Sequence, residues 1–86
     1  MTAPDRELPF KLNTPANQLA KNLGRRLRYL RAQAGITQLE LAKKASMDRT
    51  YLCRLERGKI LPRYDVLVRL AESLGVSVTE IVRSTK

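Results

Sequence analysis

The chain has 86 residues, which fits one small domain, and its 17 lysines and arginines outnumber 8 acidic residues, giving a formal net charge of +9. Such an excess of positive charge predicts a polyanionic partner, either nucleic acid or an anionic membrane surface. Without histidine and with a single cysteine, the chain is expected to hold no metal, cofactor or internal disulfide, and no apolar run approaches the roughly 20 residues that cross a bilayer.

The N-terminal part contains three of the four prolines and has no helical period. Because proline pushes the residue before it toward extended geometry, we expect residues 1–16 to form a flexible arm and residues 17–86 to form the folded domain. Leu8, Phe10 and Leu12 alternate between prolines. This pattern is too short to predict a strand, and these side chains could instead dock on the domain or on a partner subunit.

The first helix is predicted to start near Asn17, a plausible N-cap, and to end at Gly35 in the C′ position. Its apolar residues recur at three- and four-residue steps, which is typical of a helix with one buried face. They are Leu19, Leu23, Leu27, Leu30 and Ala34.

A second, shorter helix is predicted over about residues 38–45, because Thr37 and Glu40 have the spacing of a capping box. In this motif each side chain binds a backbone N–H at the start of the helix. The apolar candidates for the core are Leu39, Leu41, Ala42 and Ala45.

The third helix is predicted over residues 49–57, with Asp48 able to cap it and Gly58 ending it. On a helical wheel one side carries Leu52, Leu55 and Glu56. The opposite side carries Thr50, Arg54 and Arg57, flanked by Arg49 and Cys53. This outer face bears no acid, whereas an ordinary solvated helix favours mixed charges.

Two further helices follow the connector that contains Pro62. The fourth has an apolar face and ends at Gly75; that face comprises Val66, Leu67, Leu70, Ala71 and Leu74. Ser77 and Glu80 repeat the capping-box spacing and open a last short helix through Val82. The sequence therefore predicts five helices, no strand and an all-α fold.

A helix, a short turn and a helix rich in donors together favour binding in the DNA major groove, whose base edges offer an informative hydrogen-bonding pattern. Arginine suits the O6 and N7 atoms of guanine, and threonine can bond a base edge or touch a thymine methyl group.

The stretches "GITQLELAKKA", "YLCRLERGK" and "LVRLAESLGVSVTEIV" resemble the phage repressor and Cro type (XRE-like) of helix-turn-helix domain over about residues 19–83. The segment "DRTYLCRLERG" is also similar to controller proteins of restriction–modification systems. The resemblance implies a compact, five-helix, lambda-repressor-like fold and a DNA-binding transcription regulator. A cytoplasmic location is expected separately, because "MTAPDRELPF" lacks the basic segment and apolar run of a signal peptide.

The resemblance also implies roles for individual residues. Gln38 would bind a phosphate and brace the first residue of the recognition helix, and Arg31 and Glu56 would form a buried ion pair. The residues implied at base edges or adjacent phosphates are Arg49, Thr50, Tyr51 and Arg54, although Tyr51 could pack on the core instead. Those implied along the DNA backbone are Arg57, Lys59 and Arg63.

Since one helix reads only a few base pairs, we expect a homodimer on a palindromic operator. The candidate dimer interface, some of which must also close the core, comprises Leu61, Val76, Val78, Ile81 and Val82.

Two other functions are compatible with the sequence. One is an antitoxin-like protein that binds a toxin and its own promoter, and the other is a nonspecific architectural binder of nucleic acid. Activation would require a surface that contacts polymerase. An enzyme is disfavoured because no nucleophile–base pair, metal set or phosphate-binding loop is present. Cys53 is either a tolerated small residue or a redox switch beside Arg49 and Arg57.

Overall fold

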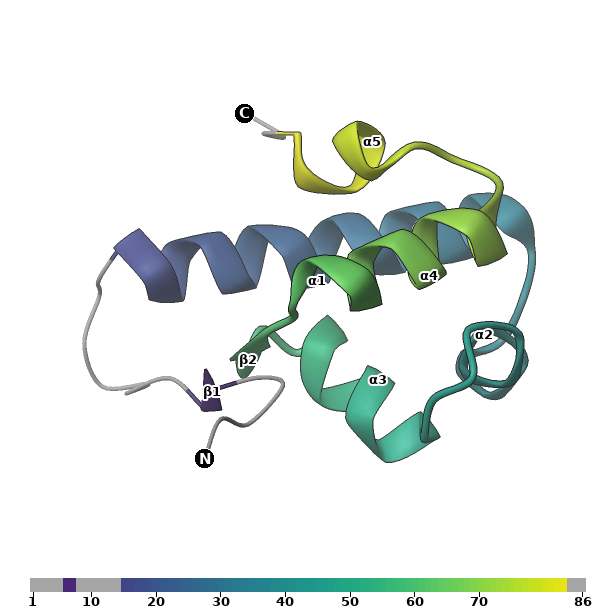
Figure 1. The fold of residues 1–86 in the computed structure, drawn as a ribbon, viewed down its shortest axis with the longest axis horizontal. Coiled ribbons are helices and arrows are strands. Elements are labelled where there is room, and N and C mark those ends of the chain that lie inside the picture. The colour runs from purple at the N-terminus through teal and green to yellow at the C-terminus, as the bar shows by residue number, and fades with distance from the viewer. Residues whose placement is uncertain (1–5, 8–14, 84–86) are drawn as a thin grey trace.

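The computed structural model describes residues 6–7 and 15–83 (Figure 1). Within these ranges five helices and two short strands follow one another along the chain. They are β1 (Arg6–Glu7), α1 (Pro15–Ala34), α2 (Gln38–Lys44), α3 (Arg49–Glu56), β2 (Ile60–Leu61), α4 (Tyr64–Leu74) and α5 (Val78–Val82). The all-α, five-helix fold predicted from the sequence is confirmed.

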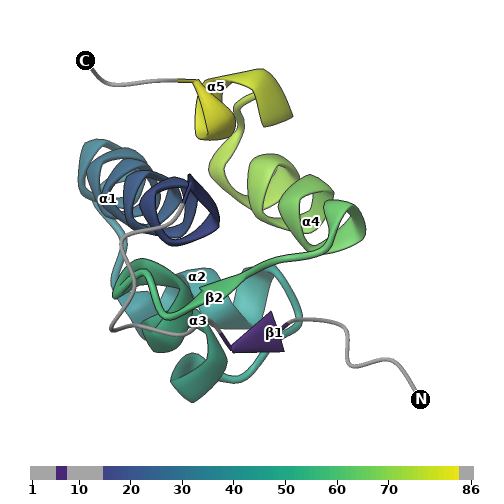
Figure 2. The ribbon, with the colours of Figure 1, turned by 90° about the vertical axis from the view of Figure 1, so that its left-hand side faces the viewer.

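The helices form three levels. The long helix α1 and helix α4 lie side by side in the middle, α5 covers them on one side, and α2 and α3 lie on the other (Figures 1 and 2). Helix α1 packs against both α3 and α5, while α2 packs against α3 and α4. Helix α3 is thereby supported from behind by α1 and from one side by α2.

One hydrophobic core holds the levels together, and every helix contributes to it. Its largest fully buried side chains are Leu27 of α1, Leu41 of α2, Leu52 and Leu55 of α3, Leu70 of α4 and Ile81 of α5. Full burial of a leucine or isoleucine side chain stabilises the fold by about 1.5–3 kcal/mol. The buried face of α3 is therefore fixed firmly to the domain, which leaves its other face available at the surface.

The predicted capping box opens α2. The Glu40 backbone N–H donates to Thr37 Oγ1 at 3.1 Å, and the Thr37 N–H donates to Glu40 Oε1 at 2.7 Å. At the start of α5, Ser77 Oγ accepts from the Glu80 N–H at 3.2 Å. Asp48 occupies the N-cap position of α3, but its side chain makes no capping hydrogen bond.

The predicted start of α1 was wrong. The helix begins at Pro15, and Asn17 lies inside its first turn with only 4% of the residue exposed, so it is not the N-cap. Proline is favourable at the first helical position, because its missing N–H would have no partner inside the helix there. At the other end Gly35 follows the helix with φ of 70°, as predicted.

Two leucines predicted for the core lie at the surface instead. Leu19 is 45% exposed and Leu39 is 49% exposed. Both lie off the buried faces of their helices. The buried face of α1 runs through Ala20, Leu23 and Leu27, and that of α2 through Leu41 and Ala42. Ala34, at the last position of α1, is also exposed.

The expectation of no strand was also wrong, because β1 and β2 form an antiparallel pair in which Arg6 is opposite Leu61 and Glu7 is opposite Ile60. Two residues are too few to show an alternating pattern, and the partners are far apart in sequence. Residues 1–5 and 8–14, and with them Leu8, Phe10 and Leu12, lie outside the described residues, so the flexible arm stays a prediction. No helix among the described residues has the length and apolarity needed to span a bilayer.

Candidate nucleic-acid interface

Helix α3 presents one face to the core and the other to the surface. Leu52, Leu55 and Glu56 are buried, as the helical wheel predicted. The short connection from α2 to α3 includes Ser46, which adopts a left-handed conformation with φ of 57°. Such a conformation is uncommon for a residue with a side chain, and it turns the chain tightly so that α2 and α3 pack against each other.

The outward face of α3 carries the residues predicted to reach DNA. Arg49, Thr50 and Arg57 are exposed, while Cys53 and Arg54 are half-buried. Glu56, the only acidic residue of α3, is 2% exposed. The outward face of the helix therefore carries basic side chains, while its carboxylate is buried. The result is a positive surface that is suited to a polyanion.

Tyr51 is half-buried and packs against the hydrophobic core. Packing on the core is the second of the two positions that the sequence allows for this side chain. A contact between Tyr51 and DNA stays a prediction.

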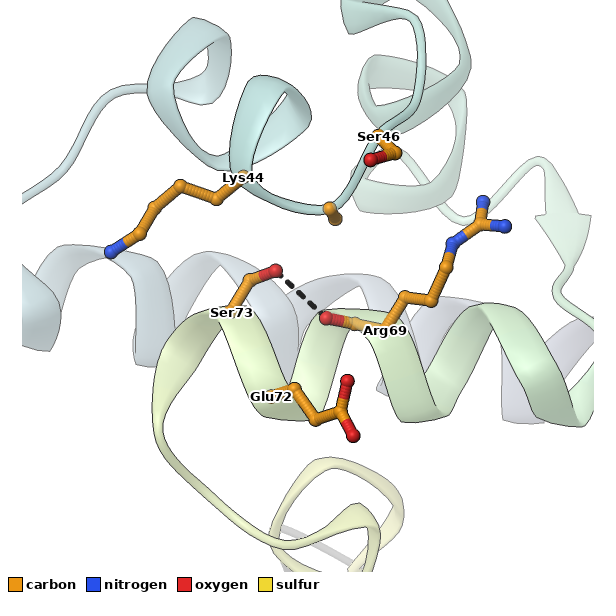
Figure 3. A pocket seen from close by; sticks show the side chains of 6 residues that line it. Lys44, Ser46, Arg69, Glu72 and Ser73 are labelled. Atoms are coloured by element: carbon orange, nitrogen blue, oxygen red, sulfur yellow. Dashed lines mark hydrogen bonds between the residues drawn. The ribbon is translucent and has the colours of Figure 1, made fainter.

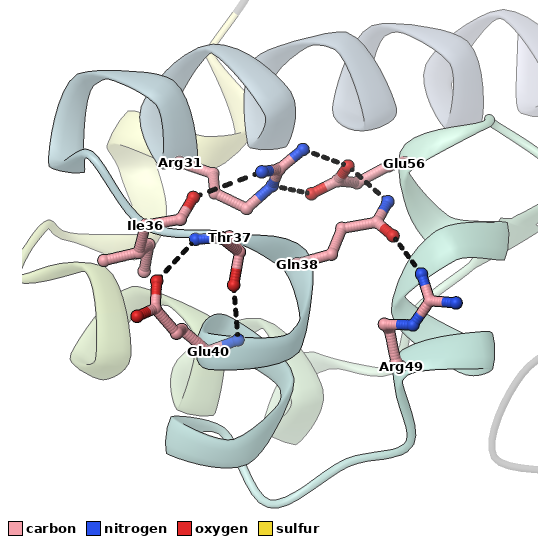
Figure 4. Close-up of polar contacts among 7 residues, drawn as sticks. All are labelled: Arg31, Ile36, Thr37, Gln38, Glu40, Arg49 and Glu56. Atoms are coloured by element: carbon pink, nitrogen blue, oxygen red, sulfur yellow. Dashed lines mark hydrogen bonds and ion pairs between the residues drawn. The ribbon is translucent and has the colours of Figure 1, made fainter.

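The predicted ion pair between Arg31 and Glu56 is present (Figure 4). Arg31 Nε donates to Glu56 Oε2 at 2.7 Å, and Arg31 Nη2 donates to Glu56 Oε1 at 3.0 Å. The third guanidinium nitrogen, Nη1, donates to the Ile36 carbonyl at 3.2 Å. These bonds join α1, the loop that follows it and α3.

The pair keeps Arg31 charged. Its hydrogen bond to the Glu56 carboxylate raises the pKa of Arg31 above its already high ordinary value, and this effect outweighs the desolvation that lowers it. A raised pKa means that the pair contributes stability below the ordinary arginine pKa and loses it only as pH rises through the raised value. The contribution is therefore constant across neutral and moderately alkaline pH.

Gln38 connects the ion pair to the start of α3. Its Nε2 donates to Glu56 Oε1 at 2.9 Å, and its Oε1 accepts from Arg49 Nη1 at 3.4 Å (Figure 4). The brace predicted between Gln38 and the first recognition-helix residue is thus present. A bond from Gln38 to a phosphate stays a prediction.

The other predicted backbone contacts lie beyond the opposite end of α3. Lys59 is exposed just after the helix, and Arg63 is exposed at the N-cap of α4. Arg63 Nη2 also pairs with Asp65 Oδ2 at 3.1 Å, with more than half of each side chain exposed. Such an exposed pair is worth little in water, so it does not prevent Arg63 from reaching another anion.

The predicted dimer interface is not one patch. Ile81 is fully buried in the core and Val82 is 41% exposed, while Val76 and Val78 are partly buried against the core. Leu61 lies in β2, on the side of the α1–α4 level opposite α5 (Figures 1 and 2). Ile81 is therefore among the members of this set that close the core, because the short helix α5 needs that side chain to attach itself to the domain. A dimer interface formed by the other residues stays a prediction.

Sequence reasoning missed the role of Gly24. An added Cβ would lie 2.5 Å from the Glu56 carbonyl oxygen and 2.7 Å from that of Leu55. The backbones of α1 and α3 therefore meet at this glycine. The sequence does carry a sign of this close contact, which is a glycine in the interior of a predicted helix, where alanine would favour helix formation.

A pocket of about 450 Å³ lies between the α2–α3 turn and α4 (Figure 3). It is lined by Lys44, Ala45, Ser46, Arg69, Glu72 and Ser73. The Ser73 hydroxyl donates to the Arg69 carbonyl at 2.8 Å, within its own helix. Because its lining carries both charges, the pocket indicates no particular ligand, and the described residues contain no group of potential metal ligands.

A short helix, a tight turn and a second helix with an outward basic face define a helix-turn-helix domain. The family model described as "Helix-turn-helix domain" matches residues 22–83. The chain belongs to this helix-turn-helix family of DNA-binding transcription regulators. The resemblance inferred from the sequence is confirmed.

Among curated relatives, the immunity repressor protein of Bacillus phage phi105 is 37% identical over 60 residues, which cover 70% of this chain and 42% of the repressor. This chain thus matches less than half of that protein's length. The uncharacterized HTH-type transcriptional regulator y4dJ of Sinorhizobium fredii is 37% identical over 67 residues, covering 78% of this chain and 87% of the regulator.

Among solved structures, the restriction-modification controller protein C.AhdI from Aeromonas hydrophila matches with a TM-score of 0.71 and 32% sequence identity. The match covers 72% of this chain and 94% of that protein. It agrees with the similarity to controller proteins noted in the sequence of α3.

Proposed function

We propose that this protein regulates transcription by binding a palindromic operator as a homodimer, with α3 in the major groove. The observation that carries the proposal is the composition of the two faces of α3. Its outward face bears Arg49, Thr50 and Arg57, whereas Glu56 is buried and paired. A helix of this kind approaches the negative DNA surface without an opposing carboxylate of its own.

Residues along α3 have different proposed roles. Arg49 and Arg54 read base edges, guanine being the best match for a guanidinium, and Thr50 and Tyr51 reach bases or adjacent phosphates. Gln38 binds the DNA backbone beside the N-terminal end of α3. Beyond the other end, the proposed phosphate contacts are made by Arg57, Lys59 and Arg63. Contacts on both sides of the groove would fix the register of the helix.

Selection of DNA sites from a random pool, at near-physiological salt, tests the proposal. We expect an inverted repeat to be recovered. On that site, Arg54→Ala should cost about 1–3 kcal/mol and relax the preference at one base pair in each half-site. Arg57→Ala, the matched control, should weaken binding to all sequences similarly and reduce the salt dependence. Recovery of sites without any shared sequence would refute a specific regulator and favour an architectural binder.

The proposed dimer uses the exposed surface of α5. Val82 is 41% exposed and belongs to a helix on the side of the molecule away from α3 (Figure 1). An interface there would leave α3 accessible in both subunits.

Sedimentation at micromolar protein concentration should give the mass of a dimer for the natural chain. Val82→Asp should shift the mass toward that of a monomer, because it places a charge in an apolar interface. Leu39→Asp is the matched control, since Leu39 is similarly exposed (49%) but lies in α2. A monomer mass for the natural chain at every concentration would contradict the dimer.

A further inference from the structure

Helix α1 carries five cationic side chains and no acidic one. Two of the cations are paired inside the domain. Arg26 Nη2 lies 3.1 Å from Glu80 Oε1, and Arg31 Nε donates to Glu56 at 2.7 Å. The other three are exposed and form no ion pair with any described residue; they are Lys21, Arg25 and Arg28.

These three exposed cations, which we call the α1 ridge, form one row along the helix. They are spaced by four and then three residues, so they point within about 60° of one another. Figure 2 views α1 nearly along its axis, with α3, α4 and α5 around it and one side uncovered by any described element. Because the ridge residues are exposed, they lie on this uncovered side.

The α1 ridge weakens the helix that carries it. Like charges three or four residues apart repel each other and destabilise a helix, whereas opposite charges at the same spacing stabilise it. An ordinary solvated face would therefore mix both signs, and α1 has no acid with which to do so. Anions bound along the row would relieve the repulsion.

The ridge begins where α1 meets the C-terminal end of α3. Gly58 lies between Arg57 and Lys59, and a Cβ added to it would lie 2.9 Å from the Cα atom of Lys21. A Cβ added to Gly24 would lie 2.5 Å from a backbone oxygen of α3. The backbones of α1 and α3 are thus in contact at both points. The ridge therefore lies next to the two residues for which we propose phosphate contacts at this end of α3.

We infer that the α1 ridge is a second phosphate-binding surface, which binds the DNA backbone where it continues beyond Arg57 and Lys59. This inference rests on the proposed binding of DNA through α3. Lysine and arginine that neutralise phosphates release counterions, and they add affinity without reading the sequence. The contact between protein and DNA is then longer than the stretch of bases that α3 reads.

The surroundings of the ridge suit a polyanion. Glu56, the only acid of α3, is 2% exposed, so neither α1 nor α3 presents a carboxylate to the DNA. Asn22 Oδ1 accepts a hydrogen bond from Arg25 Nη2 at 2.7 Å. This bond to a neutral side chain restricts the rotamers of Arg25 and leaves its charge uncompensated. Arg25 therefore loses less conformational entropy when it binds an anion.

The position of the ridge favours DNA over an anionic membrane surface. A helix that lies on a membrane combines its cations with an apolar face that enters the acyl boundary. The large exposed apolar side chains of the described residues are instead spread over four helices and form no such face. They are Leu19, Tyr29, Leu39, Tyr64 and Val82.

The salt dependence of DNA binding tests the inference. The ridge variant combines Lys21→Gln, Arg25→Gln and Arg28→Gln, since glutamine has a similar helix propensity. Each subunit of the proposed dimer then loses three phosphate contacts, so the slope of log K against log salt should decrease by about 5 in magnitude. The control variant removes the same number of exposed cations from α2 and α4, and should change the slope by less than about 1. Its substitutions are Lys43→Gln, Lys44→Gln and Arg69→Gln.

Phosphate ethylation interference should locate the ridge contacts on the selected operator. Ethylation of the phosphates next to those that Arg57 contacts should weaken binding of the natural chain and not of the ridge variant. The base preference should be the same in both proteins, because phosphate contacts carry no sequence information. A change of base preference in the ridge variant would overturn the inference.

Failure of the inference can be told apart from failure of the proposed function. Equal slopes for the ridge and control variants would show that the ridge acts only through net charge, which overturns the inference and leaves the regulator intact. The slopes are also measured on a duplex of random sequence, so the ridge is tested even if site selection recovers no operator. Vesicles of phosphatidylcholine and phosphatidylserine test the membrane. Vesicles that retain the natural chain and release the ridge variant, with an unchanged DNA slope, would overturn the inference.

Discussion

Replacement of Glu56 by alanine is expected to lower the free energy of unfolding by about 3 kcal/mol. The substitution leaves the Arg31 guanidinium and the Gln38 amide without their shared acceptor, inside a structure where the Glu56 side chain is 1% exposed. Breaking a buried ion pair costs about 3–5 kcal/mol. We place this pair at the lower end, because 22% of the Arg31 side chain is exposed and water can solvate part of its charge.

Urea unfolding followed by circular dichroism measures this effect. Glu72→Ala is the matched control, since Glu72 is an exposed glutamate of α4, and it should change stability by less than about 0.5 kcal/mol. The double variant Arg31→Met with Glu56→Leu should recover much of the loss, because apolar side chains of similar size need no partner. Equal midpoints for Glu56→Ala and Glu72→Ala would show that the ion pair contributes nothing to stability.

The effect of Glu56→Ala should extend to DNA binding even in molecules that remain folded. Gln38 would lose the bond that orients its amide, and Arg49 would lose its brace. The same carboxylate thus contributes to the stability of the fold and to the positions of Gln38 and Arg49, which we propose contact DNA.

Most of the helices were predictable, because local signals mark where they start or stop. The Thr37–Glu40 capping box fixes the start of α2, and Gly35 and Gly75 follow α1 and α4 at positive φ. The start of α1 lacked such a signal, because Pro15 is compatible with both an extended arm and a first helical turn. The β1–β2 pair depends on two segments far apart in sequence, which no periodicity reveals.

The candidate site was predictable to the extent that it depends on one helix. The spacing of Leu52, Leu55 and Glu56 alone separates the buried and outward faces of α3. The bond between Gln38 and Glu56 was not foreseen, because it depends on how α2 crosses α3. The burial of Ile81 could not be predicted either, because either the core or a partner subunit can cover an apolar side chain of a short helix.

Gly24→Ala is expected to lower the free energy of unfolding by about 2 kcal/mol, although alanine favours a helix by about 1 kcal/mol. The added Cβ would meet backbone atoms of α3, with the Glu56 carbonyl oxygen only 2.5 Å away. If the neighbouring atom belonged to a side chain, that side chain could rotate away from the added Cβ. The neighbouring atom is a backbone carbonyl oxygen, which moves only if α1 and α3 separate. Separation would disturb the leucines packed between these helices and the bonds from Arg31 to Glu56.

Two further variants distinguish this steric effect from backbone strain when unfolding is followed in urea. Gly35→Ala places a side chain at φ of 70° with no atom within 4 Å, so it should cost about 1 kcal/mol through strain alone. Gly24→Val, which adds bulk at the close contact, should destabilise more than Gly24→Ala. A Gly24→Ala protein that is more stable than the natural chain would mean that helix propensity dominates and that α1 can move away from α3 without cost. The expected order would instead show that the close contact at Gly24 sets the separation between α1 and α3. It would thereby also set the position of the outward arginines on the face that we propose contacts DNA.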